Sequence, residues 1–322
     1  MGVAMESSAG GICPAPGEES PGMNASVPMV LVAGGANVDV KVRPSRATAE
    51  GISTPGRVHV VPGGVARNVA EVLARLEAQV RLASVVGTDP WGTWLIARTA
   101  AAGVETSAII RRRGRTGIYV TVDGQGVADT GILEAAPPPM WRHLPVEDAD
   151  LVVLDANPTA AVLRYLAGRA RRLALVGTSP AKVVRLRPLL PRAWLVSLTE
   201  AEARSLLGAG EGNLREDAEL ARAVQAAGPQ AVLLTLGRRG LGLLREKWTA
   251  TPAHPARVVN ATGAGDTAAG VVIYGLLAGW SSRRLLPRAA LAAAMTVGVW
   301  GNVHPRVGTV SSWRGISERR QA

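Results

Sequence analysis

The feature that most constrains the fold is an alternation of short β-branched runs with longer amphipathic segments, which begins at Met29. This alternation is typical of strands joined by helices, and it favours βαβ units with a mostly parallel sheet. The expected strands are Met29–Ala33, Arg57–Val61, Val80–Val85, Thr116–Val122, Leu151–Leu154, Leu173–Val176, Trp194–Val196, Ala231–Thr235, Leu241–Leu244 and Arg257–Val259. The expected helices are Ala66–Leu76, Trp91–Ala102, Thr159–Ala170, Glu200–Leu207, Glu216–Ala227, Thr267–Ala278 and Pro287–Val299. We therefore predict an α/β fold whose ligands bind at the carboxyl ends of the strands.

Two stretches, residues 38–61 and 109–133, break the alternation because they hold extended, glycine-punctuated runs without a helix. They predict a small β appendage that serves as a lid on the main sheet. The chain has no sequence repeat and no long linker, so we expect a single domain over residues 28–322. Residues 1–27 are rich in Gly, Pro, Ser and Glu and carry no apolar period, which predicts a disordered leader.

Composition excludes several classes of protein. A single cysteine, Cys13, rules out a disulfide scaffold. The longest uncharged apolar runs are shorter than the ~20 residues that a membrane-spanning helix needs. No basic residue precedes Lys41, so the chain lacks the basic region of a secretory signal. We expect a cytoplasmic protein with no membrane partner.

The charge balance raises the question of a nucleic-acid partner, because 36 Lys and Arg against 25 Asp and Glu give a net charge of +11. The basic residues are scattered, and only residues 111–113 with Arg115 form a cluster. The chain has no Phe, and aromatic residues make up 3% of it, which is poor material for stacking on bases. We therefore interpret the charge as a solvated arginine surface and expect no nucleic-acid partner.

The most informative segment is residues 258–267, where an apolar run leads through a glycine-rich turn into an apolar helix. Glycines let consecutive backbone N–H groups converge, and a helix start adds positive charge, so the amides of Gly263, Ala264 and Gly265 form a cradle for an anion. The segment also fits the loose dinucleotide pattern G-x-G-x-x-A, but that site needs an acidic residue about 20 positions further on. After Asp266 the next acidic residue is Glu318, and no glycine-lysine pair fits a P-loop.

Asp266 lies at the expected start of this helix, and two roles are open to it. It is either a capping carboxylate, the commoner role of Asp at a helix start, or a general base that takes a proton from a substrate hydroxyl. In the second role the neighbouring amides hold the transferring phosphoryl group. The motif alone does not decide between these roles.

Two N-terminal segments are candidate acceptor-binding turns. Gly63-Gly64 precedes an amphipathic helix that carries Asn68, and a glycine pair permits close approach of a ligand to the backbone. Asp39 follows the first strand, where its carboxylate is suited to accept two adjacent sugar hydroxyls. The alternative interpretations are a turn with a helix cap for the first segment and an ordinary β-turn Asp for the second.

A fourth segment, residues 232–240, is a buried strand followed by a glycine turn into another strand. By itself it predicts a hairpin. If the segment lies beside the glycine-rich turn at Gly263, it is suited to bind a nucleotide. The residues at that binding surface are Thr235, Gly237 and Gly240.

Together the four segments resemble the ribokinase-like (PfkB) family of sugar and nucleoside kinases, over residues 29 to about 310. Gly63, Gly64 and Asn68 resemble the family's first signature, and residues 262–266 (Thr-Gly-Ala-Gly-Asp) resemble its second. The resemblance implies a three-layer α/β sandwich with a small β lid. It also implies ATP as the donor, Mg²⁺, and phosphorylation of a sugar hydroxymethyl group.

The resemblance implies a role for each candidate residue. Asp266 is the catalytic base, and the amides of Gly263, Ala264 and Gly265 form the anion hole. The sugar is held by Asp39, Gly63, Gly64 and Asn68, with Thr116 and Tyr119 closing over it, and the ATP site is lined by Thr235, Gly237, Gly240 and Thr262. Glu200 orders Mg²⁺ through water.

Two residues depart from the family pattern. Asn260 stands where most members have an Asp that is tied to a monovalent cation site, so activation by such a cation is not expected. Ser197 replaces the Asn of an Asn-x-x-Glu pattern that ends at Glu200. The implied Mg²⁺ role therefore rests on Glu200 without its usual Asn.

Within the family, Arg67-Asn68 together with Asn260 most resembles pseudouridine kinases, which implies transfer to the 5′-hydroxyl of a C-nucleoside. The alternatives are another sugar kinase, for ribose, fructose or adenosine, and a sugar- or nucleoside-binding regulator that has lost catalysis. Exposed lid strands often pair edge to edge, so a homodimer through the lid is a further expectation.

Overall fold

The computed structural model describes residues 28–48, 50–122, 124–208 and 216–309. The leader expected over residues 1–27 lies outside these ranges. None of the helices within them combines the length and the apolar character that crossing a bilayer requires.

A nine-stranded sheet forms the centre of the molecule, in the order β13-β12-β11-β10-β9-β8-β1-β4-β5. Its strands are β1 (Met29–Ala33), β4 (Gln79–Gly87), β5 (Ile109–Arg112), β8 (Leu151–Asp155), β9 (Leu173–Val176), β10 (Ala193–Thr199), β11 (Val232–Thr235), β12 (Leu241–Leu244) and β13 (Trp248–Thr251). All neighbours pair in parallel except β11 with β12 and β12 with β13. The prediction of a mostly parallel α/β sheet is confirmed. The strand order reverses between β1 and β8, and ligands bind at such a point.

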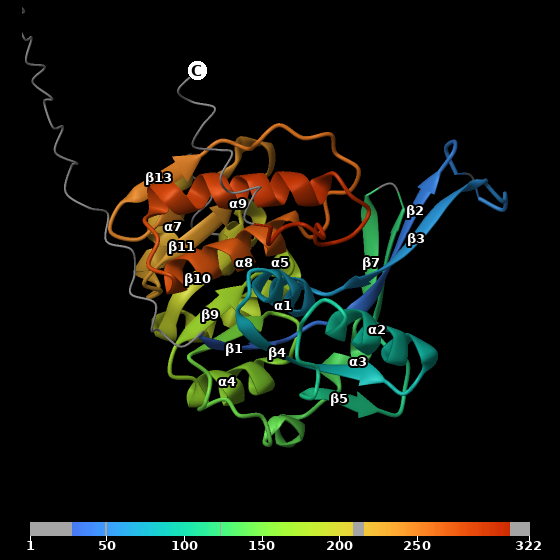
Figure 1. Cartoon of the computed structure of the whole chain (residues 1–322), viewed down its shortest axis with the longest axis horizontal. Coiled ribbons are helices and arrows are strands. Elements are labelled where there is room, and N and C mark those ends of the chain that lie inside the picture. Colours follow the sequence, from blue (N-terminus) through green and yellow to red (C-terminus); the bar gives the residue numbers. More distant parts are fainter. Residues whose placement is uncertain (1–27, 49, 123, 209–215, 310–322) are drawn as a thin grey trace, which may run out of the picture.

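Helices cover both faces of this sheet (Figure 1). Alternate side chains of a strand point to opposite faces. Val30 and Val32 therefore pack in one core layer, and Leu31 and Ala33 pack in the other. The first layer includes α1 (Val65–Arg75), α8 (Ala264–Leu277) and α9 (Ser282–Val297), and the second includes α4 (Ala160–Arg169), α6 (Glu200–Leu207) and α7 (Asp217–Ala226). The remaining helical segments of the described residues are α2 (Pro90–Ala100), α3 (Gly131–Glu134), α5 (Pro180–Val183) and the 3-10 turns η1 (Pro138–Trp141), η2 (Val184–Arg192) and η4 (Gly237–Arg239).

A second, four-stranded sheet projects from the body of the molecule (Figure 1), in the order β3-β2-β6-β7. Its strands are β2 (Asn37–Pro44), β3 (Gly56–Gly63), β6 (Ile118–Val122) and β7 (Gln125–Asp129), and we call it the small sheet. β2 pairs antiparallel with β3 and parallel with β6, so the two expected lid segments meet in one sheet. The second segment is shorter than the predicted 109–133. Residues 109–112 form β5, which pairs with β4 at the edge of the main sheet.

The strand expected over residues 257–259 is not formed. In the described part of the chain these residues join no strand ladder, and the Val259 N–H donates to the carbonyl oxygen of Val297 (2.7 Å) at the end of α9. β-branched character favours a strand only where an edge is free to pair. The strands β2, β5, β7 and β13 are absent from the predicted set.

Helix α9 begins before its predicted start at Pro287. The Ser281 side chain accepts a hydrogen bond from the Arg284 N–H (3.4 Å), and the helix starts at Ser282. A serine cap satisfies one of the free N–H groups of a first turn, so Pro287 lies inside the helix.

Candidate active site

The start of α8 is the first part of the site. The helix begins at Ala264, not at the predicted Thr267, because Gly263 takes a left-handed conformation (φ 88°) as its N-cap. A Cβ at Gly263 would lie 2.0 Å from the carbonyl oxygen of Asn302, so this position requires glycine. The N–H groups of a first turn have no acceptor within the helix, and the helix dipole is positive at this end. The turn therefore has the geometry of an anion cradle.

The Asp266 carboxylate lies in this first turn and lines a cavity of about 490 Å³, which we call the acceptor cavity. Its Oδ2 accepts a hydrogen bond from Asn68 Nδ2 at 2.7 Å. Burial raises the pKa of Asp266 to about 7, the Asn68 hydrogen bond opposes that rise, and nearby carboxylates add to it. A carboxylate with a pKa near neutral is suited to take a proton from an alcohol at neutral pH.

A buried arginine fixes the orientation of Asn68. Arg67 Nη1 donates to Asn68 Oδ1 (2.9 Å) and to the carbonyl oxygen of Pro62 (2.8 Å), and its Nη2 pairs with Glu71. A guanidinium is only a donor, so it must face the amide oxygen of Asn68. The amide nitrogen is thereby turned toward Asp266, and one of its two N–H bonds remains for a ligand.

The pH dependence of kcat/KM is expected to follow the ionisation of Asp266. A general base must be ionised, so kcat/KM should rise with pH through a midpoint near the pKa of about 7. Asn68→Ala removes the hydrogen bond that lowers this pKa, and the midpoint of the pH–rate profile should move to higher pH. Asn37→Ala is the matched control, because the Asn37 amide donates to Asp39 instead (2.6 Å). Equal shifts in the two variants would contradict the coupling.

Asp39 on β2 is almost fully buried and is held by two amides. Asn37 Nδ2 donates to its Oδ1 (2.6 Å), and Asn302 Nδ2 donates to its Oδ2 (2.7 Å). Burial raises the pKa of Asp39, whereas the Asn302 hydrogen bond and the charge of Lys41 oppose that rise. Gly63 lies against this carboxylate, since a Cβ there would be 1.9 Å from Oδ1. Each carboxylate oxygen accepts more than one hydrogen bond, so Asp39 keeps capacity for substrate hydroxyls.

The acceptor cavity brings together most of the residues expected to bind the acceptor. The lining includes Asp39, Gly64, Asn68 and Tyr119 with Asp266, and also Thr262, which was expected at the ATP site. Thr116 is not among the lining residues. Its hydroxyl donates to Asp89 and accepts from the Gly87 N–H (3.0 Å), so it fastens the segment before β6 to the start of α2.

A second cavity of about 990 Å³, the donor cavity, adjoins the first. Thr235, Gly237 and Gly240, the residues predicted to bind ATP, line it together with small apolar side chains of α9. Both cavities are lined by Thr199, Thr235 and Gly265. A Cβ at Gly265 would meet nothing closer than Thr235 Oγ1 at 3.9 Å, so the glycine leaves the junction open. A phosphoryl group at this junction would lie beside both the α8 amides and Asp266.

Glu200 lines the donor cavity, where its carboxylate pairs with Arg204 (2.9 Å) and with Arg239. The hydrogen bond from Arg204 and the charge of Arg239 lower the pKa of Glu200, so the group is ionised at neutral pH. Within the described residues no three His, Cys, Asp or Glu side chains gather into a metal site. Mg²⁺ commonly binds through one carboxylate, substrate phosphates and water, and Glu200 fits that pattern once an arginine contact is exchanged.

Asn260 braces the loop that leads into α8. Its Nδ2 donates to the carbonyl oxygens of Thr262 (3.2 Å) and Gly301 (3.4 Å), and its Oδ1 accepts from the Thr262 N–H (3.1 Å). An amide N–H thus occupies carbonyl oxygens that an aspartate could not engage, because an ionised carboxylate is an acceptor only.

Sequence reasoning missed Asp155, a fully buried carboxylate at the carboxyl end of β8. Its Oδ2 accepts from the N–H groups of Gly35 (2.8 Å) and Ala66 (2.9 Å), and its Oδ1 accepts from the Asn157 N–H (2.8 Å). Asp155 therefore ties the turn after β1 to the start of α1. Its place directly after a buried apolar strand was the available signal.

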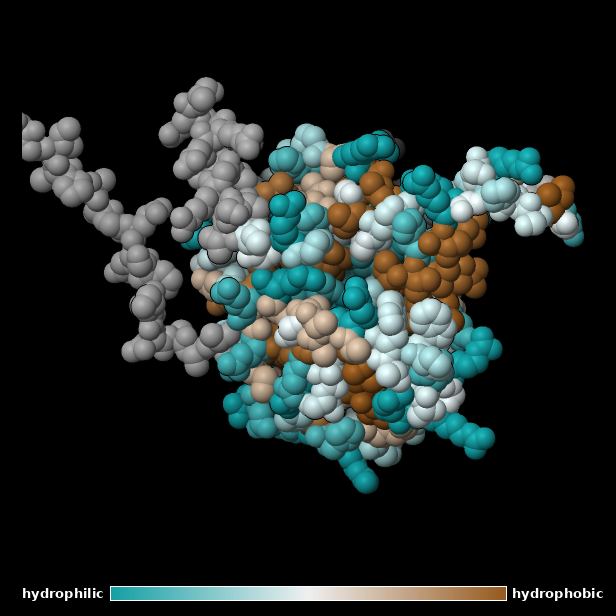
Figure 2. Space-filling view, turned by 45° about the vertical axis from the view of Figure 1, so that its right-hand side comes forward, coloured by the Kyte–Doolittle hydropathy of each residue, from teal (hydrophilic) through white to brown (hydrophobic). Residues whose placement is uncertain are grey.

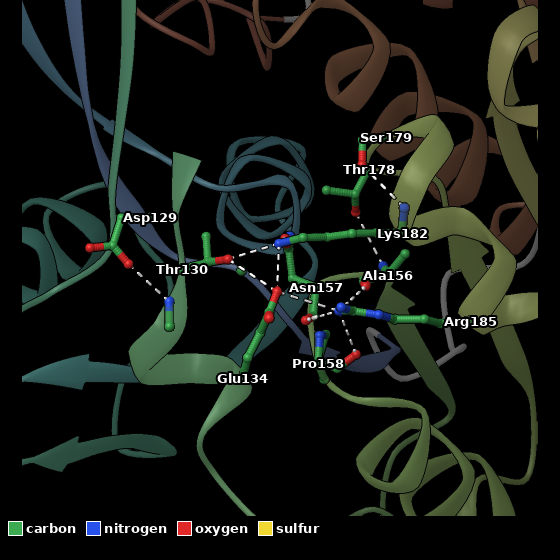
Figure 3. Close-up of polar contacts among 12 residues, drawn as sticks. Asp129, Thr130, Glu134, Ala156, Asn157, Pro158, Thr178, Ser179, Lys182 and Arg185 are labelled. Carbon is green, nitrogen blue, oxygen red and sulfur yellow. Dashed lines mark hydrogen bonds and ion pairs between the residues drawn. The ribbon is translucent and has the colours of Figure 1, made fainter. Parts of the chain in front are cut away.

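A second group of polar side chains in the acceptor cavity was also missed. Thr130, Asn157 and Lys182 line the cavity, and they lie together in Figure 3 with Glu134 and Arg185. Lys182 is in the short helix α5, in a segment that carries no motif.

Comparison with known proteins agrees with this geometry. A model of the pfkB family of carbohydrate kinases matches residues 27–306. An uncharacterized sugar kinase of Escherichia coli is 30% identical over 285 residues, which cover 83% of this chain and 77% of the relative. The pseudouridine kinase of E. coli is 26% identical over 269 residues, covering 78% of this chain and 83% of that protein.

Among solved structures, the ribokinase of Arabidopsis thaliana in complex with ribose and ATP has the same fold. The TM-score is 0.75 at 23% identity, over 90% of this chain and 99% of the ribokinase. The three-layer arrangement with its small sheet is therefore ribokinase-like. Because the family model spans most of its residues, the chain belongs to the pfkB family of carbohydrate kinases and is a phosphotransferase that acts on an alcohol group.

Proposed function

We propose that this kinase transfers the γ-phosphoryl group of ATP to the 5′-hydroxyl of a nucleoside, with pseudouridine as the favoured acceptor. The observation that carries the proposal is the position of Asp266, whose pKa is about 7 and which lines the acceptor cavity directly after Gly265, a residue that lines both cavities. The likeness to a pseudouridine kinase and the presence of Arg67-Asn68 and Asn260 support a nucleoside acceptor. The further polar group around Lys182 supports it as well, because a free pentose does not need that group.

The residues of the chain supply positioning and charge in this reaction. Asp39 and Asn68 orient the sugar, and Asp266 takes the proton of the 5′-hydroxyl as its oxygen attacks the phosphoryl group. The first-turn amides of α8 stabilise the charge that develops on that group. The small sheet, through Tyr119, covers the acceptor cavity and limits access of water.

The donor cavity fits ATP. Gly237 leaves open space beside the backbone, and the small side chains Ala290, Ala293 and Ala294 of α9 offer an apolar face to a base. Mg²⁺, when bound, neutralises charge between the phosphates. We propose that Glu200 holds the ion through water in exchange for its contact with Arg239.

A coupled assay of ADP release tests the proposal, with ribose, fructose, adenosine, uridine and pseudouridine as acceptors. The expected result is the highest kcat/KM for pseudouridine. Preference for ribose, fructose or adenosine would replace the proposed acceptor while leaving the kinase assignment intact. Saturable acceptor binding without ADP release from any acceptor would favour a binding regulator.

We expect no activation by monovalent cations, because the Asn260 amide already engages the carbonyl oxygens of Thr262 and Gly301. Turnover should be the same in potassium chloride and in tetramethylammonium chloride at equal ionic strength. Asn260→Asp removes both N–H donors and adds a negative charge, so this variant should become responsive to potassium. Stimulation of the wild type by potassium would contradict the bracing role.

The two faces of the small sheet differ in character. Asp39 on β2 pairs in register with Tyr119 on β6, and both line the acceptor cavity. The next residues along each strand face the other way. There Val60, Val120 and Val127 lie in one row across the sheet, with Val127 77% exposed. Figure 2 shows an apolar patch on this projecting part of the molecule.

We propose that a second copy of this chain covers that apolar face, because a contiguous row of valines on one sheet is suited to pair with its own copy about a two-fold axis. Size-exclusion chromatography with light scattering should show a dimer for the wild type. Val60→Lys combined with Val127→Lys should give a monomer. Val184→Lys, at an exposed valine of η2, should leave the dimer intact. A wild type that stays monomeric at every concentration would remove the proposal.

A further inference from the structure

The acceptor cavity contains a group of side chains that the sugar and phosphoryl chemistry leaves unused. Thr130, Asn157 and Lys182 line the same cavity as Asp266. They come from the residue after β7, from the segment after β8 and from α5. We call these three residues the Lys182 group.

The Lys182 ammonium is the centre of this group (Figure 3). Its Nζ donates to Thr130 Oγ1 (2.7 Å) and Asn157 Oδ1 (3.2 Å), and it pairs with Glu134 (2.8 Å). Arg185 pairs with the same carboxylate (3.5 Å). Two cations therefore share one carboxylate, and the Lys182 side chain remains 21% exposed. The ammonium lines the cavity and favours an electron-rich atom of a ligand.

Asn157 is held in one orientation beside the ammonium. Its Nδ2 donates to Asp155 Oδ2 (3.0 Å), which turns its Oδ1 toward Lys182. An ammonium is a donor only, whereas an amide oxygen and a hydroxyl accept. All three N–H bonds of the ammonium are engaged, so a ligand takes a donor by replacing the longest of these contacts, the one with Asn157 Oδ1 (3.2 Å). The Lys182 group then offers a donor next to two acceptors. Its complement is a ring edge on which a carbonyl oxygen neighbours an N–H group.

Other parts of the proposed reaction do not account for this arrangement. The sugar and its reacting hydroxyl are met by Asp39, Asn68 and Asp266, and the residues that line the donor cavity do not include Lys182. An anionic acceptor such as a sugar phosphate is disfavoured, because the Glu134 carboxylate lies 2.8 Å from the ammonium. A neutral ring with carbonyl groups is the remaining fit.

We propose that the Lys182 group is the base subsite of the acceptor cavity and selects a pyrimidine-dione ring, as in uridine and pseudouridine. Lys182 donates to a ring carbonyl, and Asn157 Oδ1 or Thr130 Oγ1 accepts from the adjacent ring N–H. The inference rests on the proposed nucleoside kinase function and names the residues that select the base.

Lys182→Met tests the subsite, because it keeps the length of the side chain and removes its donors. A lost charge-assisted hydrogen bond should raise KM for pseudouridine and uridine by about 10-fold to 100-fold, with kcat little changed. KM for ribose should not change, since free ribose has no base. Lys247→Met, at an exposed lysine, is the matched control. Thr130→Val is a second variant of nearly equal volume, and its effect should likewise be confined to nucleosides.

Isothermal titration calorimetry with uridine, pseudouridine, ribose and fructose 6-phosphate separates this inference from the proposed kinase function. If nucleosides bind the wild type but are not phosphorylated, the proposed function fails, and weaker nucleoside binding by Lys182→Met still supports the subsite. Equal losses for ribose and nucleosides, or no loss in either variant, overturn the subsite. Binding of fructose 6-phosphate that Lys182→Met abolishes, without an effect on nucleosides, shows a phosphate site instead and overturns it too.

Discussion

Replacing Asp266 with asparagine is expected to lower kcat by about 100-fold or more, the usual contribution of a positioned general base. The asparagine keeps the shape of the side chain and can still accept from Asn68, so the geometry of the cavity should survive. What it loses is the ability to take the proton of the attacking hydroxyl. Steady-state ADP release at saturating acceptor and ATP measures the effect. Turnover close to that of the wild type would exclude Asp266 as the base.

Stability provides the control for this variant. The folded protein raises the pKa of Asp266 above the ordinary value of an aspartate, so the ionised carboxylate weakens the folded state as pH rises from the ordinary value toward about 7. Above pH 7, Asp266→Asn should therefore unfold at the same temperature as the wild type or at a higher one. A thermal melt monitored by circular dichroism would reveal a fold defect as a lower midpoint. Loss of turnover with an intact or raised midpoint assigns the effect to chemistry.

The sequence predicted which segments form strands of the main sheet better than it predicted which strands pair with one another. Residues 29–33 and 151–154 read as buried strands because they are continuous apolar runs, and they lie side by side as β1 and β8. Residues 109–112 resembled the lid because glycines follow them, yet they pair with β4. Residues 257–259 are apolar and β-branched, but Val258 is 56% exposed and finds no ladder in the described part of the chain. Pairing depends on which edge is free, and a local pattern does not contain that information.

The same distinction between local patterns and distant contacts applies to the residues of the site. Asp266 and Gly263 stand in a motif whose backbone requirements are local, so the sequence was enough to single them out. Asp155 and Lys182 stand in no motif, and their importance comes from contacts with residues far away in the chain. Asp155 accepts from Gly35, which is 120 positions distant, and Lys182 contacts Thr130 across 52 positions. Such contacts appear only when the strand ends are brought together.

Replacing Gly263 with alanine is expected to lower kcat by about 100-fold to 1,000-fold, the range for loss of an oxyanion-hole donor. The new Cβ would lie 2.0 Å from the Asn302 carbonyl oxygen, and backbone cannot give way as a side-chain tip can. The turn must therefore move, and the first-turn amides of α8 move with it. Asn302 also donates to Asp39 (2.7 Å), so KM for the acceptor should rise as well. Steady-state kinetics at varied acceptor and ATP separates the two effects.

Gly279→Ala is the matched control, because it separates backbone strain from displacement of the anion cradle. Gly279 follows the other end of α8 and is also left-handed (φ 72°), but a Cβ there meets nothing within 4 Å. Alanine at either position should cost about 1 kcal/mol or more of folding free energy, since a residue with a side chain is strained at positive φ. Only Gly263→Ala should also lose turnover. Equal kcat values in the two variants, at comparable stability, would mean that the start of α8 serves the fold and does not hold the phosphoryl group.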